Sequence, residues 1–494
     1  MPRPNILLIT TDEQNARTCG FAGDPVIQTP NMDRLAAEGT VFSRAYTPQP
    51  LCTPARASVW TGQHVTSHGV NGNIFTGRRK GIRAGTVTFA RLLRMAGYET
   101  GLIGKRHLGF ENEADIALDY QDLAESKFDF NPKGMTDHYR RWLAEQGHTK
   151  QEIETWVRED LHEEYLRWHG AVKHPLAEDL YVDSYVGRRA VEYLSNRGDR
   201  PFFLWVSFCS PHHPYDPPGR YAEMYDSADV PLPDRDPSEL DEKPLRQRIR
   251  AIRCARNEPL PHGWGAPSEE VQRIYEDPDL CPSGEEIAGM IPEEVQRRMI
   301  AYYYGTVSLC DDRIGQIIRA LEEQGLWENT IVVFTSDHGD HLGEHYLWLK
   351  GVTAYDSLAR VPFVVRMPDG RGAGDQCDEL VSLFDLAPSF LRWAGAEQPY
   401  TPEGHDFRER LDGACFQPLL EGTGQPIHEE LFIGTQAVVT KEWKYVHNAG
   451  DMDELYHLAE DPTEQVNLSG EPAHNAVEAE LRGRLFERFD IESE

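Results

Sequence analysis

Short apolar runs alternate along this chain with segments of helical periodicity, and this alternation restricts the fold more than any other feature. Segments with the residue pattern of helices separate these runs. The clearest are 182–196 and the long segment 292–324, which ends at Gly325. Such alternation is typical of a parallel sheet whose strands are connected by crossover helices. The apolar runs predicted to be strands are 5–10, 98–103, 202–209, 330–336 and 361–366.

The pattern changes near residue 420, where short strand-like pieces at hairpin spacing lead to a final helix. We therefore predict an α/β fold. A large mixed, mostly parallel sheet sandwiched by helices occupies residues 1–420, and a small antiparallel sheet plus helix occupies 421–494. Two inserts, at about 132–170 and 215–294, interrupt the larger domain. The second is rich in proline and charge with little periodicity, and both are interpreted as loops or lids over a site.

Composition excludes several classes of protein. The 494 residues carry 81 acidic and 50 basic side chains, and the resulting net charge of −31 repels nucleic acid. No segment reaches the roughly 18 apolar residues of a membrane span, and the first residues lack the long apolar run of a signal peptide. We expect a cytoplasmic protein that binds neither nucleic acid nor membranes. The oligomeric state is left open, with a homodimer or higher homo-oligomer among the options.

Two of the predicted strands are each followed by a pair of residues that can bind a metal ion. Asp12 and Glu13 follow the first strand, and Asp337 and His338 follow the strand at 330–336. The carboxyl ends of parallel strands lie at one edge of a sheet, so the two pairs can meet. Clustered carboxylates repel one another unless a cation lies between them, and these ligands suit Ca²⁺, Mg²⁺ or Mn²⁺, with the imidazole favouring Mn²⁺. For either pair alone, a helix cap or a solvated loop is the simpler interpretation.

A third candidate element is the helix predicted to begin near Cys52. Pro54 suits a first helical turn, and Gly62 is a typical helix end. The helix dipole favours negative charge at this terminus, and Arg56 adds a positive charge one turn later. The segment therefore predicts an anion site that contains a sulfur nucleophile. The alternative is a buried structural cysteine, and the eight cysteines show no CxxC spacing that would indicate a zinc site or a disulfide framework.

The residues from Cys52 to Arg56 resemble the C-x-P-x-R motif of the type I sulfatases, in which the cysteine is converted to Cα-formylglycine. The resemblance covers nearly the whole chain. It implies an alkaline phosphatase-like fold, in the superfamily of formylglycine-dependent arylsulfatases and phosphonate monoester hydrolases. The other segments that carry it are 104–109 (G-K-x-H-L-G), 210–214 (P-H-x-P), 337–339 (the second metal pair), Lys350 downstream, and 444–468 (the C-terminal subdomain).

The resemblance also implies cofactors and partners. These are one divalent cation, Ca²⁺ or Mn²⁺, a formylglycine made from Cys52 by a maturation enzyme, and a small sulfate ester as substrate. The metal ligands that it implies are Asp12, Glu13, Asp337, His338 and the modified Cys52. The catalytic residues that it implies are Cys52, Arg56, Lys105, His107, His212 and Lys350.

The implied mechanism gives each of these side chains a task. One hydroxyl of the hydrated aldehyde attacks sulfur, and the second later expels the sulfate. Lys105 and Lys350 hold the sulfate oxygens, and Asn73 adds a polar contact to the substrate. His212, rather than its neighbour His213, protonates the leaving group. His107 acts as the base when the sulfate is expelled.

Three functions stay open at this point. The first is hydrolysis of sulfate monoesters, the second is hydrolysis of phosphonate monoesters or phosphate diesters at the same site, and the third is metal binding without catalysis. His338, where many sulfatases have Asn, and Glu13, where they have Asp or Gln, favour the second. Lys105 and His107 favour the first, and the intact Cys52 motif argues against the third. The histidines after the second metal pair, at 341 and 345, are expected in a solvated loop.

Overall fold

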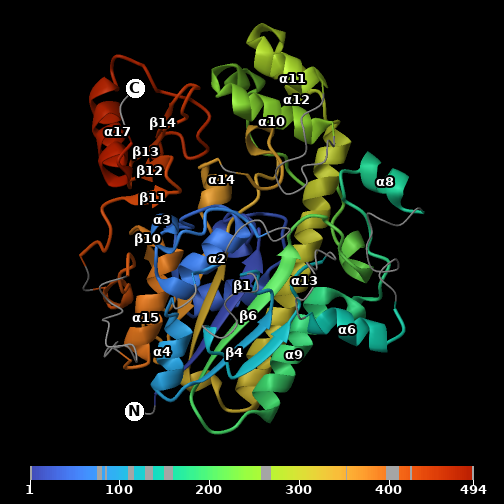
Figure 1. Cartoon of the computed structure of the whole chain (residues 1–494). Helices are drawn as coiled ribbons and strands as arrows, with labels where there is room; N and C mark the ends of the chain where they lie inside the picture. The colour runs from blue at the N-terminus through green and yellow to red at the C-terminus, as the bar shows by residue number, and fades with distance from the viewer. Residues whose placement is uncertain are drawn as a thin grey trace.

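An eight-stranded sheet lies at the centre of the computed structural model, which describes residues 3–74, 81–83, 86–108, 116–127, 137–148, 160–256, 269–351, 353–396, 411–422 and 425–491. The strand order is β5-β4-β6-β1-β7-β8-β2-β9 (Figure 1). The strands are β1 (Asn5–Asp12), β2 (Thr40–Phe42), β4 (Glu99–Gly104), β5 (Tyr120–Leu123), β6 (Phe202–Pro211), β7 (Thr330–Ser336), β8 (Phe363–Arg366) and β9 (Gln376–Cys377). Outside this sheet, β3 (Ala45–Tyr46) pairs with β10 (Val381–Ser382).

The sheet is mixed and mostly parallel, which confirms the predicted fold class. The strands β5, β4, β6, β1 and β7 run in one direction, and β8 is antiparallel to β7. β1 lies in the middle, where Leu7 is opposite Leu204 of β6 and Val332 of β7. All five predicted strands are present. The sequence missed β2, β5 and β9, because strands of two to four residues are too short to show a period.

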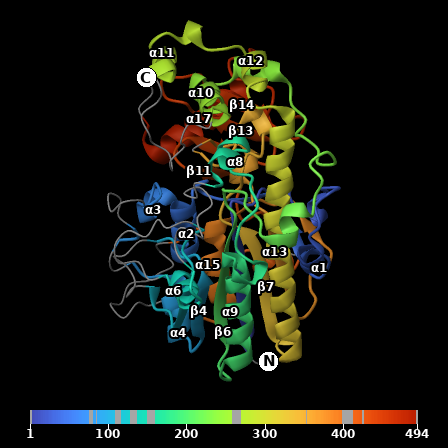
Figure 2. The same cartoon turned by 90° about the vertical axis from the view of Figure 1, so that its right-hand side faces the viewer.

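Helices cover both faces of the sheet, because alternate side chains of each strand point to opposite faces. From β1, Leu7 and Ile9 pack into one hydrophobic layer, and Ile6 and Leu8 pack into the other. Figure 2 shows α13 and α1 on one side of the strands and α2 and α4 on the other. The helices of the first layer are α1 (Pro30–Ala37), α9 (Val182–Asn196) and α13 (Glu293–Glu323), and those of the second are α2 (Cys52–Thr61), α4 (Phe89–Met95) and α15 (Leu386–Trp393).

A separate antiparallel sheet with one helix follows near the C-terminus, as predicted from the hairpin spacing. Val438, Tyr445 and Leu455 on one face of this sheet pack against Leu481 and Leu485 of the helix. Its elements are β11 (Leu431–Ile433), β12 (Ala437–Val439), β13 (Trp443–Val446), β14 (Glu454–His457) and α17 (Asn475–Phe489).

The second insert contains more helix than we expected from its sequence. Ile249 and Ile252 on its first helix share a buried core with Val439 and Tyr456 of the C-terminal sheet. Four arginines interrupt these apolar positions and conceal the helical period. Its helices are α10 (Leu245–Ala255), α11 (Glu269–Glu276) and α12 (Gly284–Ala288), and the first insert contains α6 (His138–Glu145) and α8 (His162–Arg167).

The second insert and the C-terminal sheet lie at one end of the molecule, whereas α6 of the first insert packs beside β5. α10 and the C-terminal strands are found beyond the carboxyl ends of the parallel strands (Figure 1). This is the end of an open α/β sheet where ligands bind. None of the described helices is both long enough and apolar enough to cross a lipid bilayer.

The buried Lys444 connects the C-terminal sheet to α14 (Asp356–Ala359), and we predict a large loss of stability without this lysine. Lys444 Nζ lies 2.6 Å from carboxylate oxygens of both Asp356 and Glu464. Lys444→Met leaves two buried acids adjacent, and although Asp356 keeps its ion pair with Arg360, Glu464 loses the one with Lys444, so the free energy of unfolding should fall by about 3–5 kcal/mol. Urea denaturation measures this loss. Lys441→Met is the matched control, because Lys441 forms a partly exposed pair with Glu379 and should cost at most about 1 kcal/mol. Equal losses for the two variants would contradict the prediction.

Candidate active site

The two predicted acidic pairs lie side by side, because β1 and β7 are adjacent and parallel. Thr11 is opposite Ser336 in the register, so the next residues, Asp12 and Asp337, emerge together at the carboxyl edge. Asp337 Oδ1 accepts hydrogen bonds from the backbone N–H groups of Glu13, at 3.2 Å, and His338, at 3.0 Å. The sheet register therefore fixes the acidic half of the site.

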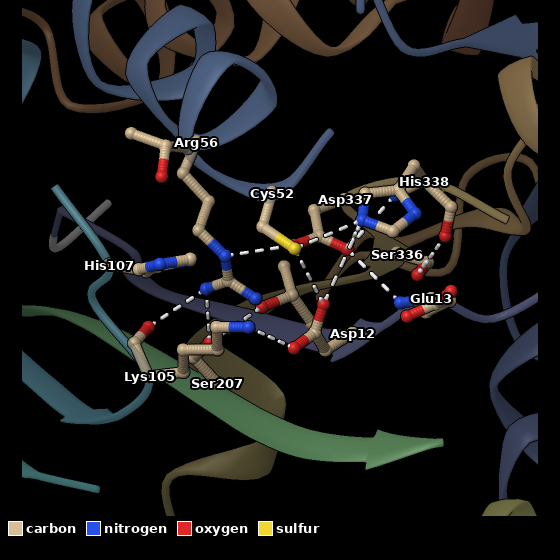
Figure 3. A network of polar contacts seen from close by, with 12 residues as sticks. Asp12, Glu13, Cys52, Arg56, Lys105, His107, Ser207, Ser336, Asp337 and His338 are labelled. Atoms are coloured by element: carbon tan, nitrogen blue, oxygen red, sulfur yellow. Dashed lines mark hydrogen bonds and ion pairs between the residues drawn. The ribbon is translucent and has the colours of Figure 1, made fainter. Parts of the chain in front are cut away.

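Cys52 is the first residue of α2 and points into this acidic edge (Figure 3). Its Sγ atom lies 3.2 Å from His338 Nε2 and 3.5 Å from Asp12 Oδ1, and the side chain is buried. The Nδ1 atom of His338 is 2.9 Å from the carbonyl oxygen of Gly339, and donation to that oxygen directs Nε2 toward Cys52. The expected helix end is also present, since Gly62 takes a left-handed conformation at φ 66°.

Arg56 connects the helix to three strands of the sheet. Its Nε atom donates to Asp337 Oδ2 at 2.8 Å, and Nη1 donates to the carbonyl oxygen of Lys105 at 2.8 Å and to Ser207 Oγ at 2.7 Å. The side chain is 0% exposed. Arg56 therefore positions the acidic edge and does not face an open anion pocket. Ser207 was missed by the sequence reasoning, although it is the one hydroxyl in the apolar run 202–209.

Lys105 and His107 reach the site from the end of β4. The ammonium group of Lys105 forms an ion pair with Asp12. His107 has a left-handed backbone with φ 50°, and its N–H donates to Glu125 Oε2 at 2.7 Å. Glu125 holds this strained turn in place. Sequence reasoning missed Glu125 because it follows β5, a strand too short to be recognised.

Glu13 joins two further predicted residues. Its Oε2 atom lies 2.8 Å from Lys350 Nζ and 3.5 Å from His212 Nε2. His212 Nδ1 is 2.6 Å from the carbonyl oxygen of His213, so that Nε2 faces the site. His213 turns away, and its Nε2 atom lies 3.0 Å from the carbonyl oxygen of His169. Of the two histidines, His212 therefore lies next to Glu13, and His213 faces His169.

Asn73 contacts the first turn of α2, and two further histidines lie in the loop after β7. Asn73 Oδ1 accepts a hydrogen bond from the backbone N–H of Thr53 at 3.0 Å, in the first turn of α2. The expectation of a solvated loop for His341 and His345 is wrong, because both side chains are buried. His341 bonds to two hydroxyl groups, and His345 Nδ1 lies 2.8 Å from Glu239 Oε2. Glu239 comes from the second insert, so the sequence around 345 could not reveal this partner.

The charges around Cys52 change its acidity. Burial and Asp12 raise the pKa of the thiol, but Lys105, Lys350 and His338 together bring the pKa below its ordinary value. Thiolate character is therefore favoured at this position. A nucleophile or a ligand atom at residue 52 is consistent with this environment.

The pKa values of two imidazoles in the site, His338 and His107, shift in opposite directions. Burial lowers the pKa of His338, but Asp337 and Cys52 raise it to about 9, so the site attracts positive charge at His338. Burial and the neighbouring Lys105 lower the pKa of His107 to about 3. The imidazole of His107 is therefore neutral at pH 7.

The donor atoms fit a divalent cation. Asp12, Cys52, Asp337 and His338 each offer one ligand atom, and these four atoms lie within 4.8 Å of one another. Beside them, Glu13 Oε1 is buried and has no hydrogen-bond partner. Two of the four atoms are carboxylate oxygens, one is an imidazole nitrogen and one is the Cys52 sulfur, and a cation between them would offset the repulsion of the two carboxylates. Glu13, the fifth predicted ligand, is not among these four residues, and its Oε2 atom forms an ion pair with Lys350.

Comparison with known proteins identifies the family. Residues 4–396 match the family model described as Sulfatase, and residues 343–490 match the model described as N-sulphoglucosamine sulphohydrolase, C-terminal. The chain belongs to the sulfatase family. It is 31% identical to an arylsulfatase of Clostridium perfringens (strain 13 / Type A), over 94% of this chain and 90% of the relative. It is 27% identical to an N-acetylglucosamine-6-O-sulfatase of Bacteroides thetaiotaomicron, over 98% and 86%.

The solved structures confirm the alkaline phosphatase-like fold. The phosphonate monoester hydrolase of Agrobacterium radiobacter matches this chain with a TM-score of 0.71 and 24% identity, over 98% of this chain and 95% of the other. At this identity the likeness concerns the fold and does not extend to the substrate. The resemblance to the sulfatases inferred from the sequence motifs is confirmed by the two family models.

We predict that loss of one acidic ligand weakens metal binding. Asp12→Asn removes a charge from the group of four ligand atoms, so its affinity for Ca²⁺ or Mn²⁺ should fall by more than the roughly 10–100-fold typical of losing an outer-shell partner. Calorimetric titration of metal-free protein measures this affinity directly. Asp311→Asn is the control, because Asp311 is equally buried but binds the backbone of Met32. Equal metal affinity of wild type and Asp12→Asn would contradict the assignment.

Proposed function

We propose that the chain hydrolyses sulfate monoesters through a formylglycine made from Cys52 and one divalent cation, Ca²⁺ or Mn²⁺. The observation that carries the proposal is the position of Cys52. Its sulfur lies at the start of α2, 3.2 Å from His338 Nε2, in a site that also gathers Lys105 and Lys350. A sulfate ester needs a nucleophile, charge neutralisation on its oxygens and a proton for the departing alkoxide. The site has a residue for each requirement.

Lys105 and Lys350 supply the charge neutralisation. Asp12 anchors the ammonium group of Lys105, and Glu13 anchors that of Lys350 at 2.8 Å. Burial lowers the pKa of Lys105, but Asp12 and Cys52 together raise this pKa above its ordinary value, so the side chain stays charged at neutral pH. Positive groups that are fixed in a buried site stabilise negative charge on a bound sulfate without reorganising.

Two groups that the chain binds or acquires supply the rest of the chemistry. Formylglycine supplies a hydrated aldehyde with two hydroxyl groups, one for attack and one for release. A cation held by Asp12, Asp337 and His338 supplies Lewis acidity. The chain's own residues orient these ligands, since Arg56 fixes Asp337 and the carbonyl oxygen of Gly339 fixes the ring of His338.

Two histidines handle protons. His212 Nε2 faces the site beside Glu13 and donates its proton to the leaving oxygen of the ester. The neutral ring of His107 accepts a proton in the step that restores residue 52. The role of His212 needs a protonated ring, and that of His107 needs a neutral one. His212 follows β6 and His107 follows β4, so the two side chains come from different strands.

Phosphonate monoesters and phosphate diesters are the second class of candidate substrate, because the Asp337–His338 pair also occurs in the hydrolases that cleave them. Lys105 and His107 favour sulfate monoesters, since we expect phosphonate hydrolases to lack them. Turnover of an aryl sulfate, an aryl phosphonate and a phosphate diester by one preparation ranks the three. A rate on the phosphonate above that on the sulfate would reverse the order of the two functions.

The modification of Cys52 is directly testable. When the protein is produced together with a formylglycine-generating enzyme, the peptide that contains residue 52 should carry an aldehyde, visible by mass spectrometry and by hydrazide labelling. Cys19 and Cys209 are equally buried and serve as internal controls that stay thiols. Cys52→Ala should fold normally and lose turnover. An active preparation with an unmodified thiol at position 52 would refute this part of the proposal.

The role of His212 is tested by varying the leaving group. An alkyl sulfate leaves as a strongly basic alkoxide, whereas nitrophenyl sulfate leaves as a stable phenolate that needs no proton. His212→Ala should therefore slow the alkyl sulfate by roughly 10²–10⁴-fold and nitrophenyl sulfate far less. His213→Ala is the matched control and should affect both substrates alike, because His213 faces His169. Equal effects of His212→Ala on both substrates would exclude a general acid at this position.

A further inference from the structure

The loop between β7 and Lys350 has a strained backbone. Four of its non-glycine residues have positive φ angles: Leu342 at 46°, His345 at 55°, Tyr346 at 57° and Leu349 at 61°. L-residues rarely adopt this conformation, and it persists only where the surrounding structure enforces it. The last of the four directly precedes Lys350. The position of Lys350 therefore depends on whatever holds this loop.

Asp340 holds both ends of the strained segment. Its Oδ1 atom accepts hydrogen bonds from the backbone N–H groups of Leu342, at 2.9 Å, and Leu349, at 3.0 Å. Asn15, three residues beyond Asp12, donates its side-chain amide to the carbonyl oxygen of Asp340 at 2.8 Å. The carboxylate thus ties the residue before Lys350 to the acidic edge of the sheet.

Tyr215 fixes the other oxygen of this carboxylate. Its hydroxyl group donates to Asp340 Oδ2 at 2.5 Å, and the side chain is 0% exposed. The ring packs edge-on against Tyr303 of α13, with 5.5 Å between the ring centroids. Tyr215 belongs to the start of the second insert, three residues after His212. One hydrogen bond therefore joins the segment that contains His212 to the loop that contains Lys350.

We propose that Tyr215 and Asp340 are positioning residues that hold Lys350 beside residue 52. The proposal rests on the function proposed above, in which Lys350 binds the sulfate oxygens. Without the Tyr215 hydroxyl, no side chain among the described residues donates to the Asp340 carboxylate, and the hydrogen bond that this carboxylate accepts from the Leu349 N–H weakens. The strained loop then relaxes, and Lys350 spends less time in the position where it meets Glu13.

Tyr215 also touches the other catalytic candidate. Its ring lies edge-on to His213, with 5.1 Å between the centroids, so a change at Tyr215 could act through the neighbouring His212. The two routes predict different results. An effect through Lys350 weakens sulfate binding equally for all esters, because Lys350 contacts the oxygens that stay on sulfur. An effect through His212 grows with the basicity of the leaving group.

The test compares Tyr215→Phe with Tyr304→Phe. Tyr304 is a buried tyrosine on α13 that also donates to a carboxylate, Asp24, far from the site. Loss of a hydrogen bond to a carboxylate corresponds to roughly tenfold or more in binding. Tyr215→Phe should raise the inhibition constant of inorganic sulfate and the KM of nitrophenyl sulfate by about that factor. Tyr304→Phe should leave both unchanged.

A double-mutant cycle decides whether Tyr215 acts through Lys350. In the Lys350→Ala background, Tyr215→Phe should have no further effect on sulfate inhibition, because the group that it positions is gone. Additive effects, or an effect that is larger for alkyl than for nitrophenyl sulfate, would overturn the positioning role. If Lys350→Ala weakens inhibition by sulfate and Tyr215→Phe does not, only this inference fails. If Lys350→Ala itself changes nothing, the proposed role of Lys350 fails, and this inference fails with it.

Asp340→Asn provides a second variant in case Tyr215→Phe does not fold. The amide retains one oxygen acceptor for the Leu349 N–H, so sulfate inhibition should weaken less than in Asp340→Ala. Inhibition that is equally weak in both Asp340 variants would contradict a role based on that backbone contact.

Discussion

The buried ion pair between Arg56 and Asp337 is the interaction on which the rest of the site depends. It joins the first turns of α2 to the carboxyl end of β7, and Nη1 of the guanidinium donates to Ser207 of β6 and to the carbonyl oxygen of Lys105 after β4. A charge that is removed from water costs several kcal/mol unless it is paired. The buried Arg56 therefore depends on Asp337 as its charged partner, and the proposed metal ion would need the same carboxylate. One side chain thus serves both the fold and the proposed chemistry.

The sequence predicted the parts of the site that are fixed by regular structure. Asp12 and Asp337 could be placed together because they end two apolar runs, and parallel strands bring their ends to one edge. Cys52 could be placed at a helix start because Pro54 and Gly62 mark both ends of that helix. The same reasoning gave the mixed sheet and the C-terminal hairpins. In each case a local pattern of a few residues carries the information.

The parts that the sequence missed depend on contacts between distant segments. Glu125 holds the turn of His107 from just beyond β5, a strand of four residues that the sequence analysis did not recognise. His345 is buried because Glu239, over a hundred residues earlier, meets its ring. The helical period of α10 is hidden by arginines whose role is set by the tertiary structure, as in the donation by Arg250 to the carbonyl oxygen of Lys350. No local pattern encodes such partners.

The burial of Cys52 sets a condition on the order of events during synthesis. The side chain is 1% exposed, and the residues that enclose it, Asp337 and His338, are added 285 positions later. At roughly 5–20 residues per second, about 15–60 s separate the appearance of the thiol from that of its enclosing strand. If Cys52 is converted to formylglycine as we propose, a large maturation enzyme can reach the cysteine only before that strand is in place. Modification and folding are thus competitors in time, and a chain that folds too early would lock its own thiol away unmodified.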